Sequence, residues 1–128
     1  MKLMVEVAPG ELIDKITILE IKLGNIEDEI KLANIRREYE ILIQTYRANI
    51  EESDALRALV DELREANAKI WDIEDDIRDL ERSKDFGERF VEVARSVYRS
   101  NDRRAATKRK INELLNSALI EEKSYAEY

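Results

Sequence analysis

Residues 53–82, SDALRALVDELREANAKIWDIEDDIRDLER, hold the most regular apolar pattern in the chain. Apolar residues recur there at alternating spacings of three and four. This heptad spacing is typical of a helix that buries a narrow seam against a partner helix. Ser53 or Asp54 can cap the start of that helix. The stretch therefore predicts one long helix and an all-α fold. The seam residues are Leu56, Leu59, Leu63, Ala66, Ile70, Ile73, Ile77 and Leu80.

Upstream of this helix, residues 11–52 contain no proline and a single glycine, Gly24. A glycine inside a helix costs only about 1 kcal/mol, so it does not by itself end one. Pro9 suits the first position of a helix. We therefore expect a helix from Glu11 to about Glu52, about 60 Å long at about 1.5 Å per residue. It should pack antiparallel on the helix at 54–82 and make the molecule elongated.

Downstream of residue 82, the sequence predicts two shorter helices. Asp85 and Glu88 have the spacing of a capping box for a third helix. Ser100 and Asn101 predict a turn, with Asn101 as the cap of a fourth helix. The expected fold is thus an elongated antiparallel long-helix hairpin, coiled-coil-like, with two shorter helices packed back on it. We expect residues 1–128 to form a single all-helical domain.

Composition removes several classes of chemistry. The chain has no cysteine and no histidine, so disulfides, thiol catalysis, the usual zinc sites and Ser-His-Asp triads are excluded. We predict no transition metal and no cofactor. Asp72, Asp76 and Asp79 share a flank of the helix at 54–82, where they form either a solvated charged face or a weak Mg²⁺ site.

Charge and hydropathy point to a cytoplasmic protein without a membrane segment. No stretch of about 20 apolar residues exists, and residues 1–10 lack the features of a signal peptide. The net charge of −7 makes nucleic acid an unlikely partner. Residues 95–110 are the exception, because this segment contains seven basic residues and only one acidic residue, Asp102. This basic segment either pairs with an acidic face of the same fold or attracts an anion.

Two groups of polar residues could form a ligand site. Asn67, Trp71, Glu74 and Arg78 share one flank beside the heptad seam, where an aromatic plate with polar groups around it suits a flat polar ligand. Alternatively, Trp71 packs beneath a neighbouring helix.

The second group lies on the predicted fourth helix. Arg104 and Lys108 lie on the same side as Ile111, so they need carboxylate partners or an anionic ligand. Glu20, Glu27 and Glu74 are the expected partners, and free N–H groups at a helix start would favour an anion. The candidate ligand-binding residues are Glu20, Asn67, Trp71, Glu74, Arg78, Arg95, Tyr98, Asn101, Arg104 and Lys108.

Five stretches resemble a known family. They are residues 9–22 (PGELIDKITILEIK), 71–78 (WDIEDDIR), 90–106 (FVEVARSVYRSNDRRAA), 108–112 (KRKIN) and 121–125 (EEKSY). Together they resemble domain of unknown function 6165 over nearly the whole chain. The resemblance implies a bacterial or phage origin and supplies no activity, substrate or catalytic residue.

We expect a non-enzymatic protein-interaction or scaffolding module that acts as a homodimer. Ile18 and Ile21 lie away from the stripe formed by Leu12 and Leu23, and one hairpin partner cannot cover both faces. Another protein is a further candidate partner. The alternative function is a small enzyme or ligand-binding protein that recognises an anionic or phosphorylated metabolite through the Arg, Lys, Glu and Trp cluster.

Overall fold

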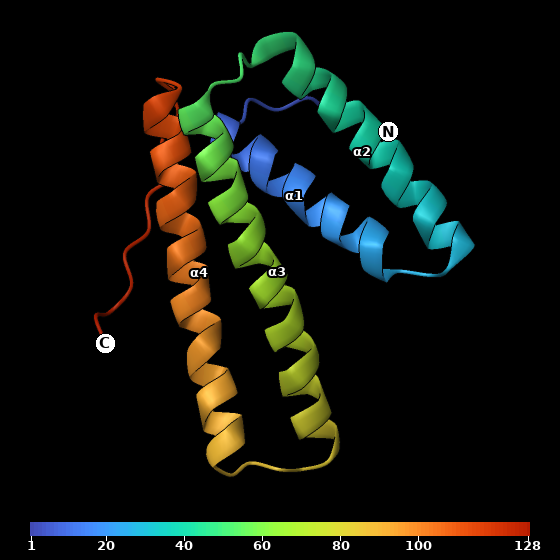
Figure 1. Ribbon diagram of the computed structural model, residues 1–128, viewed down its shortest axis with the longest axis vertical. Helices are drawn as coiled ribbons and strands as arrows, with labels where there is room; N and C mark the ends of the chain where they lie inside the picture. Colours follow the sequence, from blue (N-terminus) through green and yellow to red (C-terminus); the bar gives the residue numbers. More distant parts are fainter.

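The computed structural model describes residues 1–128 and confirms an all-α fold, with four helices and no strands (Figure 1). No helix combines the length and the apolar character needed to cross a bilayer. The helices are α1 (Pro9–Asn25), α2 (Glu29–Asn49), α3 (Asp54–Arg82) and α4 (Glu88–Leu114).

The predicted helix over 11–52 is wrong, because the chain turns back between Asn25 and Glu29 and forms the hairpin of α1 and α2. Ile26 ends α1 in an extended conformation, and the side chain of Asp28 accepts the backbone N–H of Lys31 at the start of α2. A side-chain cap of this kind stabilises a new helix start. The sequence did not reveal this cap for two reasons. Asp28 lies within the acidic run at 27–29, and the helical spacing of apolar residues continues across the break.

The predicted division of the last part of the chain is also wrong, because α4 runs without interruption through Ser100 and Asn101. Ser100 is buried, so its small side chain fills a packed position of α4 instead of ending the helix. Tertiary packing outweighs the modest local preference of such residues for turns. The predicted capping box is absent: Gly87 occupies the cap position of α4, and Asp85 accepts the backbone N–H of Gly87.

The cap predicted for the central helix is confirmed, since the Ser53 hydroxyl accepts the backbone N–H of Leu56 at 3.1 Å. The long antiparallel hairpin consists of α3 and α4. The predicted hairpin, in which a helix over 11–52 packs on the helix at 54–82, does not form. Two arms, α1–α2 and α3–α4, diverge from the end where all four helices meet (Figure 1).

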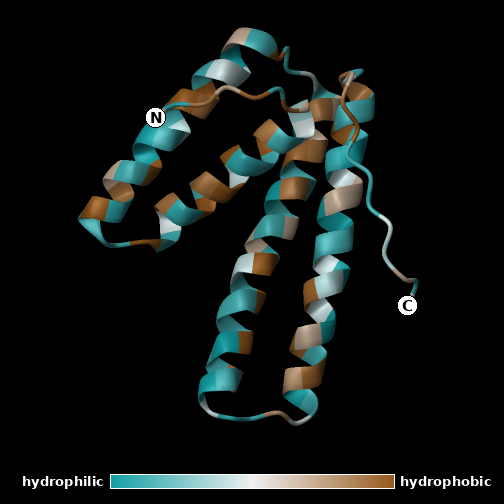
Figure 2. Ribbon diagram, turned by 180° about the vertical axis from the view of Figure 1, so that it is seen from behind, coloured by the Kyte–Doolittle hydropathy of each residue, from teal (hydrophilic) through white to brown (hydrophobic).

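The hydrophobic core lies at this shared end. Ile13, Leu56, Leu63 and Ile111 come from three helices and are at most 2% exposed. Half-buried residues from the end of α2, including Tyr46, pack against them. Hydrophobic segments face each other along the α3–α4 arm as well (Figure 2). Helix α1 packs against each of the other three helices, so side chains on one of its faces can contact α3 and α4.

Candidate functional site

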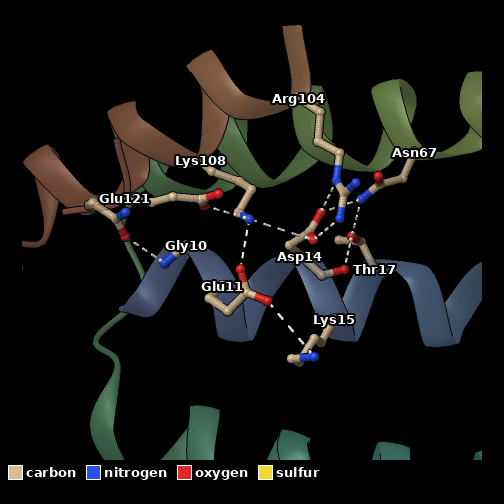
Figure 3. A network of polar contacts seen from close by, with 10 residues as sticks. Gly10, Glu11, Asp14, Lys15, Thr17, Asn67, Arg104, Lys108 and Glu121 are labelled. Carbon is tan, nitrogen blue, oxygen red and sulfur yellow. Dashed lines mark hydrogen bonds and ion pairs between the residues drawn. The ribbon is translucent and has the colours of Figure 1, made fainter. Parts of the chain in front are cut away.

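A buried carboxylate lies where α1 meets α3 and α4. Asp14 on α1 is 1% exposed and receives two hydrogen bonds from Arg104 of α4, at 2.9 Å from Nε and 2.5 Å from Nη2 (Figure 3). Asn67 of α3 donates to the same carboxylate from Nδ2, at 2.9 Å. A fork of guanidinium donors on a carboxylate is among the strongest polar contacts in proteins. We call this pair and the groups bonded to it the Asp14 network.

The environment of Asp14 keeps it ionised. Burial raises the pKa of a carboxyl, but the hydrogen bonds from Arg104 and Asn67 outweigh burial, and the pKa of Asp14 lies below its ordinary value. The same hydrogen bond to Asp14 raises the pKa of Arg104. Thr17 completes the arrangement, because its hydroxyl donates to the Asp14 carbonyl at 2.8 Å and accepts from Asn67 at 2.9 Å.

Lys108 extends the network one turn along α4. Its Nζ lies 2.7 Å from Glu11, 3.1 Å from Glu121 and 3.9 Å from Asp14 (Figure 3). Burial alone would lower the pKa of Lys108, but the hydrogen bonds to Glu11 and Glu121 reverse the shift and raise it. The positive charge of Lys108 is therefore compensated by carboxylates of the same chain.

The start of α1 is held by α4. Ala8, at the cap position, has no side-chain acceptor, so the first N–H groups of α1 need partners from elsewhere. Asn112 of α4 accepts the N–H of Gly10 at 2.7 Å. A side chain at residue 10 would meet the Lys108 carbonyl at 2.6 Å, which shows how closely the two helices approach.

These contacts make the Asp14 network a structural connection. No buried side-chain nitrogen or oxygen lacks a hydrogen-bond partner. What remains open to solvent lies beside the network, in a groove of about 340 Å³ between α1 and α3.

The groove contains half of the residues proposed from the sequence. Ile18 and Ile21 of α1 and Ile70 of α3 give it an apolar lining. Asp75 adds a carboxylate that the sequence analysis did not select. Within the groove, Arg78 pairs with Glu74 at 3.4 Å. The proposed residues that line it are Asn67, Trp71, Glu74, Arg78 and Arg104.

The other proposed residues lie elsewhere. Glu20 pairs with Arg64 of α3 at 3.1 Å, not with Arg104 or Lys108. Arg95 is exposed on α4. Tyr98 and Asn101 line a different hollow, of about 810 Å³, between α4 and the carboxyl-terminal segment. Lys108 belongs to the Asp14 network. The structure therefore does not bring the ten proposed residues together in one site.

The carboxyl-terminal segment 117–128, called the tail below, lies along α4 (Figure 1). Glu121 contacts Lys108, and Glu122 contacts Arg109 at 3.0 Å. The ring of Tyr128 lies 5.0 Å from that of Tyr98, and the Arg99 guanidinium lies 6.0 Å from the centre of the Tyr128 ring.

A family model matches residues 1–128, the whole of the chain. The chain belongs to DUF6165. DUF6165 is described as a family of unknown function, so membership assigns no chemistry to the groove or to the network. Searches of curated proteins and of solved structures found no match to the chain.

Sequence reasoning on this DUF6165 chain found the basic half of the network and missed the acidic half. The inward position of Arg104 and Lys108 is confirmed, with Lys108 7% exposed. Glu20 and Glu74 were the wrong carboxylates, since the partners are Asp14, Glu11 and Glu121. A signal for Asp14 did exist, because Gly10, Asp14 and Thr17 are spaced i, i+4, i+7 and share one face of α1. Small and polar residues on one face predict a close helix contact.

Proposed function

We propose that this chain is a protein-interaction module that assembles as a homodimer through its α3–α4 arm. The observation that carries the proposal is the exposed area. A compact monomer of 15.0 kDa has about 7,000 Å² of accessible surface. This chain has 9377 Å². An excess of this size supports a fold that is completed by a partner.

The far part of the α3–α4 arm is the region that lacks cover. We define it as residues 72–82 of α3 and 88–99 of α4, and call it the distal arm. Beyond the groove, α3 and α4 have only each other as neighbours (Figure 1). Phe86, in the turn that joins the helices, is 54% exposed and Val91 is 52% exposed. Two helices alone bury one seam and leave the flanks open.

Charge favours a second copy as the partner. The distal arm carries six acidic residues against two arginines on α3, whereas α4 carries three arginines against two glutamates. If the twofold axis runs along the arm, α3 of one copy lies on α4 of the other, and acidic flanks meet basic flanks. Four helices then form a bundle, in which each apolar seam has a partner on both sides.

The test is the mass in solution, with two pairs of matched substitutions. The wild type should behave as a particle of twice the chain mass in light scattering at micromolar concentration. Phe86→Glu with Val91→Glu should give the monomer, because two charges enter the proposed interface. Ile30→Glu with Ile41→Glu, on the equally exposed face of α2, should leave the dimer unchanged. A monomeric wild type, or equal effects of the two pairs, would contradict the proposal.

The second candidate function is ligand binding in the groove, because the groove brings together five of the residues selected from the sequence. Arg104 has guanidinium donors beyond the two used by Asp14, and Trp71 supplies a flat face. These groups suit a small anionic or phosphorylated molecule with a planar part.

Trp71 is the only tryptophan, so its fluorescence reports on the groove directly. Inorganic phosphate should change the emission of the wild type in a saturable way. Arg78→Ala should weaken the response, whereas Arg82→Ala, on the same helix and outside the groove, should not. A linear response that both variants share would exclude a phosphate site in the groove.

A further inference from the structure

Beyond Ser117, the tail rests on α4 through side chains alone. After Ser117, whose N–H bonds to the Asn112 carbonyl, no backbone hydrogen bond joins the tail to the rest of the chain. Asn116 adopts a left-handed conformation, with φ of 52°, and redirects the chain at the end of α4. The tail can therefore leave α4 without breaking any secondary structure.

The face of α4 beneath the tail carries a definite pattern of charge and aromatic surface. Lys108 and Arg109 hold the two consecutive glutamates of the tail, and Tyr98 with Arg99 holds its last tyrosine. We call this surface the α4 tail face. It selects for an extended segment with an acidic pair followed by an aromatic residue.

The tail fits this face incompletely. A hollow of about 810 Å³ remains between Val97, Tyr98 and the tail. Tyr125 is 77% exposed and Tyr128 is 74% exposed, so neither ring is buried. Between the glutamates and Tyr128, the tail lines the hollow with Lys123, Tyr125 and Ala126, and these side chains leave it unfilled. A segment with a bulkier apolar residue at that place would bury more surface.

We propose that the α4 tail face is a docking site for an acidic, tyrosine-containing peptide segment of a partner protein, and that the tail covers this site until the partner replaces it. The tail is tethered, so its effective concentration at the site is in the millimolar range. The apparent dissociation constant of the partner segment is its intrinsic value divided by the fraction of time for which the tail leaves the site open. The proposal does not depend on the homodimer, because Lys108 and Arg109, which hold the acidic pair, lie outside the distal arm. Only Tyr98 and Arg99 belong to both surfaces.

The test uses the full chain and a fluorescein-labelled peptide with the sequence of residues 117–128, followed by fluorescence anisotropy. An open-tail variant carries Glu122→Gln and Tyr128→Ala. It leaves Glu121 in place, because Glu121 neutralises the buried Lys108. The peptide should bind the open-tail variant at least tenfold more tightly than the wild type. A peptide with glutamine in place of Glu121 and Glu122 should bind at least tenfold more weakly.

Two charge reversals locate the site. Arg109→Glu in the open-tail background should lower peptide affinity about tenfold, because it removes the partner of the second glutamate. Arg47→Glu, which makes the same change of net charge on an exposed position of α2, should leave affinity unchanged.

Three results would overturn the proposal. The first is equal binding to the wild type and the open-tail variant. The second is an equal loss with Arg109→Glu and Arg47→Glu, which would indicate attraction by net charge only. The third is a dimer that dissociates in the open-tail variant, which would assign the α4 tail face to the tail of a second copy.

Discussion

Asn112 on the last helix accepts the backbone N–H of Gly10 at the start of the first helix, across 102 residues of chain. The acceptor that Ala8 cannot provide thus comes from another helix. The start of α1 is fixed at a point where its backbone lies against α4, with no room for a side chain at residue 10. Helix capping and helix packing are here a single contact, so disturbing either one disturbs both.

Substitution at Gly10 should separate packing from helix propensity. Gly10→Ala places a methyl group 2.6 Å from the Lys108 carbonyl and should lower the free energy of unfolding by about 1–3 kcal/mol. Gly24→Ala is the matched control, because an added methyl group there meets nothing within 4 Å. The control should be neutral or stabilising by up to about 1 kcal/mol. Urea denaturation of both variants measures the difference, and equal effects would mean that α1 and α4 are not in close contact.

Breaking the buried pair should be costly. Asp14→Asn leaves the Arg104 guanidinium without its carboxylate and should lower the free energy of unfolding by about 3 kcal/mol. Glu20→Gln is the control, since the Glu20–Arg64 pair is only partly buried, and solvent-exposed pairs contribute about 0–1 kcal/mol.

A double-mutant cycle with Asp14→Asn and Arg104→Met measures the coupling of the two side chains. The combined variant should be more stable than the sum of the single effects predicts, because neither charge is then left buried alone. Additive effects would show that the two side chains do not interact.

Acid should weaken the fold through Asp14. Its pKa is lower in the folded chain than the ordinary value of 3.8. The stability that this difference supplies is present above the ordinary pKa and is lost as the pH falls through the depressed pKa. Asp14→Asn should therefore show a shallower loss of stability than the wild type below about pH 4. Thermal melts between pH 6 and pH 2 would detect this, and parallel curves would contradict it.

Hydrogen exchange should reveal the uneven stability of the molecule. Amides of α3 near Leu56 and Leu63, which are fully buried, should exchange slowly. Amides of the distal arm should exchange faster in the monomeric Phe86→Glu, Val91→Glu variant than in the wild type, because the proposed dimer covers them. If exchange in the distal arm is the same in both proteins, and α2 is the part in which wild-type amides exchange more slowly than in the variant, the interface lies on α2 instead.

The fold was predictable for a helix whose own sequence contains both a regular apolar pattern and a cap. The heptad seam of residues 56–80 and the Ser53 cap predict α3 without reference to the rest of the chain. Asp28 could not be recognised as the cap of α2 because it lies within a run of acidic residues. The turn predicted at Ser100 was wrong because burial of this residue depends on neighbouring helices. In both cases the local sequence was ambiguous and tertiary packing made the choice.

The site was predictable only on one side. A helical wheel places Arg104 and Lys108 inward because only their own helix matters for that inference. Their partners depend on which helix faces α4 and in what register. Asp14 and Glu11 lie 90 and 97 residues away, and no pattern within a single helix encodes such a pairing.

The separation of Asp14 and Arg104 also has a consequence for the order in which the chain folds. Contacts between α3 and α4 are close in sequence, whereas joining residue 14 to residue 104 requires closure of a long loop. We therefore expect α1 to dock last, onto an α3–α4 hairpin that has already formed. Contacts made after the transition state act on the rate of unfolding, so loss of the Asp14 pair should accelerate unfolding and leave refolding almost unchanged. During synthesis, α1 can pack on α2 and α3 first, but Asp14 remains without its arginine partner until α4 has emerged.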